Sequence, residues 1–265
     1  MRTIVIGERL NSSNRKIRSM LESGDLKALL DIADAQIAAG AEYIDLNTSL
    51  LMERELEALI STGTEIRRRS GAKISVDSPD PGVLVEGSGV FGADCIVNSI
   101  TCDDESLGMV MPAVSSAGSA VIVLLKDKNG IPADAGGRLK LAEKAFEAAA
   151  GEKLPPGRIF FDPVFSPVAT EKKGLAAALD TLRMLKESFP GSHRIGGLSN
   201  ISFGLPLRKL LNRTFLSMAV SHGLDAVICD PTDEKLMEAL RASEAIAGLD
   251  PGCRGFLSYF RSSVK

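Results

Sequence analysis

The stretch DLKALLDIADAQIAAGAEYIDLN, residues 25–47, contains one complete helix followed by one strand. Asp25 is a suitable N-cap, apolar residues then recur at helical spacing, and Gly40 can end the helix. The apolar stripe consists of Leu26, Leu29, Leu30, Ala33 and Ile37. The strand-like YIDLN begins directly afterwards. The stretch therefore predicts a helix over residues 25–39 that packs beside a short strand.

The same pattern repeats along the 265-residue chain. Eight short apolar runs read as strands: TIVIGE, EYIDLN, AKISVDS, DCIVNSI, SAVIVLLK, RIFFDPV, HRIGGLSN and DAVICD. Stretches with helical spacing separate them, near 52–69, 82–90 (short), 104–117, 138–150, 172–188, 206–222 and 233–247. Alternating strands and helices indicate parallel β-α units. Eight units over this length predict an α/β fold, a (β/α)₈ TIM barrel forming a single domain over residues 1–265, with a doubly wound open sheet as the competing architecture.

The composition narrows the classes of partner. The net charge of −3 gives no reason to expect a nucleic acid. The four cysteines form no C-x-x-C pair and the chain has only two histidines, which disfavours a zinc or iron–sulfur site. No signal peptide is visible, and no apolar run reaches the roughly 18–20 residues of a membrane helix. We therefore expect no metal, no membrane and a cytoplasmic protein.

Polar side chains gather at the ends of the predicted strands. They are Glu8, Asn11, Asp45, Asn47, Asp77, Asn98, Lys126, Asp162, Ser199, Asn200 and Asp230. Strand ends meet at the mouth of a barrel, where barrel enzymes carry their active sites. Carboxylates accept hydrogen bonds and carboxamides both donate and accept, which suits a flat heterocycle such as a pterin. A divalent metal is the alternative ligand, but it leaves Asn98 and Asn200 without a role.

Several of these residues have simpler explanations. Asp45 and Asp230 could cap helices or loops, and Asp77 and Asp162 could form turns beside prolines. Lys126 raises the alternative of a Schiff-base aldolase, against a solvated lysine next to Asp127.

The segment GGLSNISFG, residues 196–204, is harder to explain by packing, since a strand that is only buried would continue with large apolar residues. Its glycines predict a close approach of the backbone to a ligand.

Seven motifs in order resemble the pterin-binding methyltransferases, which transfer a methyl group between methyltetrahydrofolate and a corrinoid protein. They are IGERLN (6–11), YIDLN (43–47), SVDS (75–78), VNSI (97–100), FFDP (160–163), GLSN (197–200) and LNRTFL (211–216). The resemblance covers nearly the whole chain. The family is similar in fold to dihydropteroate synthase, whose own N-terminal and glycine-rich motifs are not seen in this sequence.

The resemblance implies a role for each matching residue. Asp77, Asn98 and Asp162 would hydrogen-bond the pterin ring, and Gly197 and Ser199 would lie against it. Asn200 would be the catalytic residue, beside the ring nitrogen that carries the methyl group, where an amide can assist a poor leaving group. Arg208 falls where the family has a basic residue near the site. The sequence departs from the family at Phe203, where the best-known members carry a glutamine.

The resemblance also implies the partners. Tetrahydrofolate or methyltetrahydrofolate would be the small-molecule substrate, and a separate corrinoid (cobalamin) protein would dock over an open mouth. The usual corrinoid motif Asp-x-His-x-x-Gly is absent from the sequence. Family members are typically homodimers. The direction of methyl transfer stays open, and Phe203 slightly favours transfer from a methylcorrinoid to tetrahydrofolate. The alternatives are a dihydropteroate-synthase-like condensation, a metal-dependent TIM-barrel aldolase and a non-catalytic folate-binding subunit.

Overall fold

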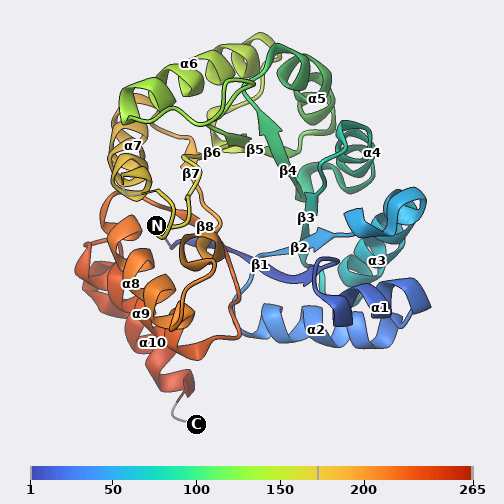
Figure 1. The fold of residues 1–265 in the computed structure, drawn as a ribbon. Helices are drawn as coiled ribbons and strands as arrows, with labels where there is room; N and C mark the ends of the chain where they lie inside the picture. The colour runs from blue at the N-terminus through green and yellow to red at the C-terminus, as the bar shows by residue number, and fades with distance from the viewer. Residues whose placement is uncertain (1, 172, 264–265) are drawn as a thin grey trace.

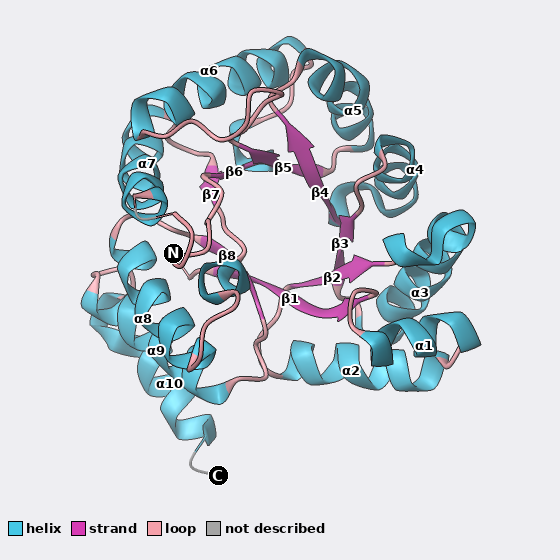
Figure 2. Ribbon diagram, viewed as in Figure 1, coloured by secondary structure: helices cyan, strands magenta, loops and turns pink. Residues whose placement is uncertain are grey.

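The computed structural model describes residues 2–171 and 173–263, and eight parallel strands form a barrel within them. The strands are β1 (Ile4–Asn11), β2 (Tyr43–Asn47), β3 (Lys73–Asp77), β4 (Cys95–Thr101), β5 (Ala120–Leu124), β6 (Ile159–Asp162), β7 (His193–Arg194) and β8 (Ala226–Cys229). Figures 1 and 2 show the strands as an inner ring surrounded by helices. The prediction of a (β/α)₈ barrel is confirmed, and the open-sheet alternative is wrong.

The barrel closes between β7 and β8. The sheet order runs β7-β6-β5-β4-β3-β2-β1-β8, so these two strands lie at its ends. A parallel bridge joins Gly197 to Ile228, and the Ile228 amide donates to the Gly196 carbonyl at 3.1 Å. The Asp225 amide donates to the Arg194 carbonyl, also at 3.1 Å. Strand β7 is thus short, and the residues that follow it complete the ring.

The helices of the outer layer are α1 (Arg15–Ser23), α2 (Leu26–Ala38), α3 (Glu55–Ser70), α4 (Pro81–Phe91), α5 (Asp104–Ala117), α6 (Ala135–Gly151), α7 (Gly174–Ser188), α8 (Arg208–Ser221), α9 (Glu234–Ile246) and α10 (Arg254–Ser263). Short 3₁₀ turns are η1 (Ser49–Arg54), η2 (Gly92–Asp94), η3 (Pro156–Arg158), η4 (Leu198–Ser202) and η5 (Pro251–Cys253). None of the described helices is long and apolar enough to cross a membrane.

Helix α2 begins as its sequence predicts. The Asp25 side chain accepts a hydrogen bond from the Ala28 amide at 3.2 Å, and the helix ends before Gly40, which has φ +106°. Residue 172, the start of the predicted helical stretch 172–188, lies outside the described residues. Helices α1 and α10 were not predicted from the sequence, because α1 buries only Ile17 and Leu21 in an otherwise polar segment.

Three hydrophobic clusters hold the layers together. The inside of the barrel is filled by Ile6, Tyr43, Ile96, Ala120, Ile122, Phe160, Ile195 and Ala226. Two larger clusters lie between the strands and the surrounding helices. The barrel interior is therefore a packed core rather than a channel.

Gly196 has a packing role that the sequence did not reveal. A Cβ at this position would overlap the Phe165 ring, which is itself buried. Phe165 also stacks edge-on against Phe215, with ring centroids 4.9 Å apart. Gly196 thus makes room for an aromatic side chain, which is a packing reason for a glycine at this position.

Replacing Gly196 by alanine is expected to lower the free energy of unfolding by about 1–3 kcal/mol, because the Phe165 ring must shift within a packed core. The matched control is Gly89→Ala in helix α4, where an added Cβ meets nothing within 4 Å. That change is expected to leave stability unchanged or raise it slightly. Denaturant unfolding of both variants tests the difference, and equal midpoints would contradict it.

Candidate active site

Strands β2, β3 and β4 bring three polar side chains to one level at the mouth. The register pairs Asn47 with Asp77 and Asp77 with Asn98, so these residues stand side by side on neighbouring strands. The Asn47 Oδ1 atom accepts hydrogen bonds from Ser12 Oγ at 2.8 Å and Ser49 Oγ at 2.9 Å. This fixes the orientation of the Asn47 amide, which also bonds to Asp77. The row is a rigid, preformed set of donors and acceptors.

Asp45 lies beneath this row and holds it in place. Its side chain is buried, and its Oδ1 atom accepts from Ser75 Oγ at 2.6 Å and from Asn98 Nδ2 at 3.0 Å. The bond from Asn98 fixes which way that amide faces. Asp45 therefore orients a neighbouring side chain and does not cap a helix, which was the simpler alternative considered for it.

Burial changes the charge of the Asp45–Asp77 pair. It raises the pKa of Asp45, and it raises the pKa of Asp77 well above its ordinary value because Asp77 is also close to the Asp45 carboxylate. Two carboxylates this close in a poorly solvated site do not both ionise easily. The pair therefore keeps a proton at pH values where isolated aspartates have lost theirs.

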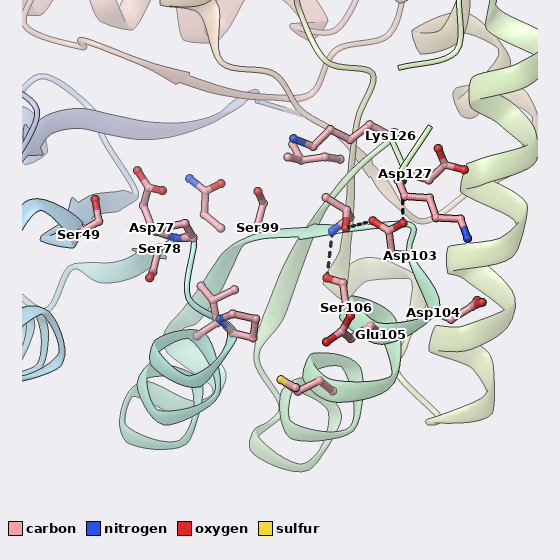
Figure 3. A pocket seen from close by; sticks show the side chains of 18 of the residues that line it. Ser49, Asp77, Ser78, Ser99, Asp103, Asp104, Glu105, Ser106, Lys126 and Asp127 are labelled. Carbon is pink, nitrogen blue, oxygen red and sulfur yellow. Dashed lines mark hydrogen bonds between the residues drawn. The ribbon is translucent and has the colours of Figure 1, made fainter. Parts of the chain in front are cut away.

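A cavity of about 1040 Å³ opens above Asp77 and Asn98. Its walls also include Ser99, Met109 and Lys126. Figure 3 shows Asp77, Ser78 and Ser99 along one side of the cavity, with Lys126 extended over the mouth from the opposite side. The cavity thus combines acceptor groups at its base with a cation at its rim.

The turn η4 carries the residues of the GLSN motif. Asn200 is exposed, and its amide nitrogen lies 3.1 Å from the position that a Cβ on Gly197 would occupy. Arg208 holds the turn from outside, since its Nη2 donates to the Ser199 carbonyl at 2.9 Å and its Nε donates to Ser202 Oγ at 3.1 Å. The absence of a side chain at Gly197 lets the Asn200 amide fold back over the strand end.

Ser199 connects the turn to strand β1. Its Oγ donates a hydrogen bond to Glu8 Oε1 at 2.5 Å. Burial raises the pKa of Glu8 to about 7, with Asp45 and Asp230 adding to the rise while the bond from Ser199 and the charge of Arg208 oppose it. Glu8, Ser199 and Arg208 line a second cavity of about 340 Å³.

Asp162 ends strand β6 and is buried. Its Oδ1 accepts from the Val164 amide at 2.7 Å, and burial raises its pKa to about 7 against the opposing charge of Arg138. Arg138, which is also buried, donates through Nη1 to the Pro163 carbonyl at 2.7 Å. The guanidinium thus anchors the chain segment that follows Asp162.

The structure brings the predicted residues together in two groups. Asp77 and Asn98 share the larger cavity, while Ser199 and Arg208 share the smaller one. Asp162 lines neither cavity, and Asn200 is exposed beside Gly197. The sequence predicts Glu8 and Asp45 as strand-end residues and does not assign them to the pterin site. Their signal was their position alone, since the bonds that reveal their roles join different strands.

The carboxylates of the mouth are engaged with hydroxyl and amide groups. Within the described residues, no group of three or more His, Cys, Asp or Glu side chains is arranged to hold a metal ion. The metal-dependent alternative therefore receives no support from the geometry. Lys126 stands at the rim rather than in an apolar pocket, which gives the Schiff-base alternative no support either.

Comparison with known proteins identifies the family. Residues 7–230 match the model of the pterin-binding enzymes. The chain is 32% identical to a methylcorrinoid:tetrahydrofolate methyltransferase of Eubacterium limosum over 97% of this chain and 96% of that protein. The chain belongs to the pterin-binding enzyme family.

More distant relatives agree with this assignment. A methionine synthase of Mycobacterium tuberculosis is 29% identical over 85% of this chain, which spans 20% of that longer protein. Dihydropteroate synthases share the fold, with a TM-score of 0.71 and 19% identity for the Coxiella burnetii enzyme and 0.68 and 19% for the Yersinia pestis enzyme. Each of these two matches covers 93% of both chains.

Proposed function

We propose that the protein is a methyltransferase that moves a methyl group between tetrahydrofolate and the cobalt of a separate corrinoid protein. The observation that carries the proposal is the preformed row of Asp77 and Asn98 at the mouth of a pterin-family barrel. A relative 32% identical over nearly the whole chain, named as a methylcorrinoid:tetrahydrofolate methyltransferase, supports the same reaction.

The pterin would lie across the mouth with its amino and ring N–H groups toward carboxylates. Asp77 and Asp162 would accept hydrogen bonds from these groups. The Asn98 amide would both donate a hydrogen bond to the ring and accept one from it. Gly197 and Ser199 would contact the ring face, and Arg208 would hold their turn. The raised pKa values of Asp77 and Asp162 fit such a role, because a ligand that donates to a carboxyl favours its ionised form.

Asn200 would act at the reacting ring nitrogen. The corrinoid supplies the cobalt that gives or accepts the methyl group. The Asn200 amide can donate to the nitrogen lone pair or accept from its N–H group, so one residue serves both directions. Asn200 is exposed at the rim, so its amide can turn to present either its N–H donor or its oxygen acceptor to the nitrogen. The remaining catalysis comes from holding the two partners in line.

The rim of the barrel suits a docked protein. Met52, Phe203 and Leu207 are 74%, 69% and 74% exposed, and Met52 and Leu207 have the unusual φ of 54°. Leu50 and Leu210 are further exposed apolar residues after β2 and β7, and Met109 and Val168 are exposed apolar residues after β4 and β6. An exposed apolar ring of this kind marks an interaction site, and a strained backbone often marks a functional one. We assign this apolar rim to the corrinoid protein.

The chain's own histidines do not suit corrinoid binding at the mouth. His193 belongs to β7 and stacks on Phe160, with ring centroids 4.4 Å apart. His222 follows helix α8, so it lies at the end of the barrel opposite the mouth. Both positions support a corrinoid that arrives on a partner.

Transfer from the methylcorrinoid to tetrahydrofolate is the direction we favour. The name of the Eubacterium limosum relative supports it. Phe203 supports it more weakly, since it replaces the glutamine of the best-known members and contributes an apolar side chain to the rim.

A homodimer is also proposed, with Phe256, Leu257 and Phe260 of helix α10 as exposed apolar side chains available to a second copy. The four free cysteines fit a reducing compartment such as the cytoplasm.

Calorimetric titration with tetrahydrofolate and methyltetrahydrofolate, with EDTA present, tests the pterin site. We expect micromolar binding of at least one of them. A methyl-transfer assay with free methylcobalamin and tetrahydrofolate then tests the reaction. Failure to bind either folate would overturn the proposal, and binding without transfer from any methylcorrinoid would leave a non-catalytic folate-binding protein.

Replacing Phe203 and Leu207 together by serine is expected to raise KM for the methylcorrinoid protein about 10-fold or more, because two exposed apolar anchors are lost. Turnover with free methylcobalamin should stay within about 2-fold of the wild type, since that molecule needs no protein interface. Ile246→Ser is the control, because Ile246 is 87% exposed at the end of α9 away from the mouth. Equal KM values for all three proteins would show that the partner docks elsewhere.

A further inference from the structure

We propose that Glu8 is a further catalytic residue, which exchanges the reaction's proton with the substrate nitrogen through the hydroxyl group of Ser199. This inference rests on the proposed function and deepens it. It assigns a task that Asn200 cannot perform, because an amide can form hydrogen bonds but is neither an acid nor a base near neutral pH.

The reaction requires one proton to be exchanged in each turnover. When the N5–methyl bond breaks, its electron pair stays on N5, and N5 then gains a proton. In the opposite direction, the N5 lone pair forms the new bond to the methyl carbon, and N5 loses its proton. A group that titrates near the working pH and reaches N5 is the most effective acid and base for this step.

Glu8 is directed into the site by an irregularity in strand β1. The pairing of β1 with β2 shifts between Gly7 and Leu10, which is a β-bulge at Glu8 and Arg9. The buried Gln36 side chain stabilises this bulge, since its Oε1 accepts from the Arg9 amide at 3.0 Å. A Cβ at Gly7 would lie 2.5 Å from the same oxygen, so Gly7 leaves the room that Gln36 needs. The fold therefore maintains a special backbone conformation at Glu8.

Glu8 and Ser199 form a two-member relay. Their oxygens are 2.5 Å apart, and Ser199 is the residue before Asn200. When Glu8 is ionised, Ser199 donates its hydrogen to Glu8. When Glu8 is protonated, it can donate to Ser199 Oγ, and the hydroxyl hydrogen is free to point at the substrate. Glu8 then gives its proton to Ser199 as Ser199 passes its own to N5, and the reverse transfer removes a proton from N5.

The charged groups around Glu8 set its pKa, so that its carboxyl can both gain and lose a proton near neutral pH. Asp45 on β2, Asp230 after β8 and the Cys229 thiol on β8 lie near the carboxyl, with Arg208 on α8 as the opposing cation. Lys209 and Asp233 stand further out on the wall of the same cavity. Burial and the two aspartates raise the pKa of Glu8 to about 7, which suits a residue that alternates between acid and base at neutral pH.

Arg208 supports the relay from the other side of the turn. Its bond to the Ser199 carbonyl fixes the backbone, while Glu8 holds the side chain of the same residue. The smaller cavity of about 340 Å³ lies between them and connects the relay to the solvent-exposed rim. Glu8 can therefore recover or release its proton between turnovers.

The pH dependence of methyl transfer in Glu8→Gln tests the inference. In the wild type, kcat is expected to change with pH around pH 7, and this change forms one limb of the pH profile. Glu8→Gln keeps the shape of the side chain but cannot ionise, so we expect kcat to fall about 10²-fold or more and the limb to disappear. Tetrahydrofolate affinity is expected to stay within about 3-fold. Asp230→Asn removes a neighbouring negative charge, and it is expected to move the limb to lower pH.

A second readout needs no turnover. Calorimetry of tetrahydrofolate binding in two buffers of different ionisation enthalpy counts the protons exchanged on binding near pH 7, and this count is expected to differ between the wild type and Glu8→Gln. Glu244→Gln is the matched control, because Glu244 is a buried glutamate of α9 that accepts from the Thr3 amide at 2.6 Å and from Arg241 at 2.7 Å, at the end of the barrel opposite the mouth. It should keep the limb and the proton count.

The outcomes separate this inference from the proposed function. A wild type that transfers no methyl group would overturn the proposed function, and the proton assignment with it. Normal transfer by the wild type with an unchanged rate, limb and proton count in Glu8→Gln would overturn the assignment of Glu8 alone.

Discussion

Replacing Asn200 by alanine is expected to lower kcat for methyl transfer by about 10²- to 10³-fold, the usual loss when one donor to a developing charge is removed. The folded state should be little affected. Asn200 is exposed on the turn η4, and changes at exposed positions usually alter stability by less than about 0.5 kcal/mol. Steady-state kinetics with tetrahydrofolate and methylcobalamin, together with denaturant unfolding, measure both effects.

Two further variants at this position identify what the amide does. Asn200→Asp keeps the shape but accepts hydrogen bonds only, so we expect it to lose as much activity as the alanine variant if donation matters. Asn200→Gln keeps both functions on a longer side chain and is expected to retain partial activity. Near-normal turnover in Asn200→Ala would remove Asn200 from the mechanism and leave the proposed relay of Glu8 and Ser199 to act at the reacting nitrogen.

The barrel could be predicted because each strand has a recognisable pattern in its own local sequence. Runs such as AVIVL in β5 are buried nearly throughout, and each is followed by a helix with a clear start or stop. The position of the site could then be predicted from the fold, because the carboxyl ends of the parallel strands meet at the mouth of the barrel. Asp77 and Asn98 were both strand-end residues in the sequence, and the register sets them side by side.

The roles of Asp45, Glu8 and Gly196 could not be predicted in the same way. Asp45 bonds to Asn98 across two strand pairings, and Glu8 bonds to a serine 191 residues away. Gly196 is constrained by the Phe165 ring, a contact between neighbouring strand ends. Such pairings depend on side-chain directions that a strand pattern does not specify. Helix α10 was missed for a related reason, since a short C-terminal segment gives few turns to reveal its period.

The second large effect is expected for Asp162→Asn, which should weaken tetrahydrofolate binding and stabilise the unliganded protein. Loss of a charged acceptor for the pterin costs about 1.5–3 kcal/mol of binding, or roughly 10- to 100-fold in Kd. The effect on stability has the opposite sign. The folded-state pKa of Asp162 is raised to about 7 from an ordinary value of 3.8, because its carboxyl is buried. Calorimetric titration and denaturant unfolding at several pH values test the two parts.

The sign of the stability effect follows from where the proton is held. Between about pH 4 and pH 7 the folded protein keeps the Asp162 proton that the unfolded chain has released. The wild type therefore loses stability as pH rises through this window, by roughly 4 kcal/mol from this group alone. An amide at this position has no proton to lose, so Asp162→Asn should match the wild type below about pH 4 and exceed it above about pH 7.

Asp180→Asn on the exposed face of helix α7 is the control for Asp162→Asn, and it should leave folate affinity unchanged. Unchanged tetrahydrofolate affinity in Asp162→Asn would mean that the pterin does not reach this carboxyl. Identical pH dependence of stability in Asp162→Asn and the wild type would mean that folding does not raise the pKa of Asp162, despite its burial. A gain in stability combined with a loss of binding would instead show that Asp162 is retained for the ligand, since the unliganded barrel folds better without its charge.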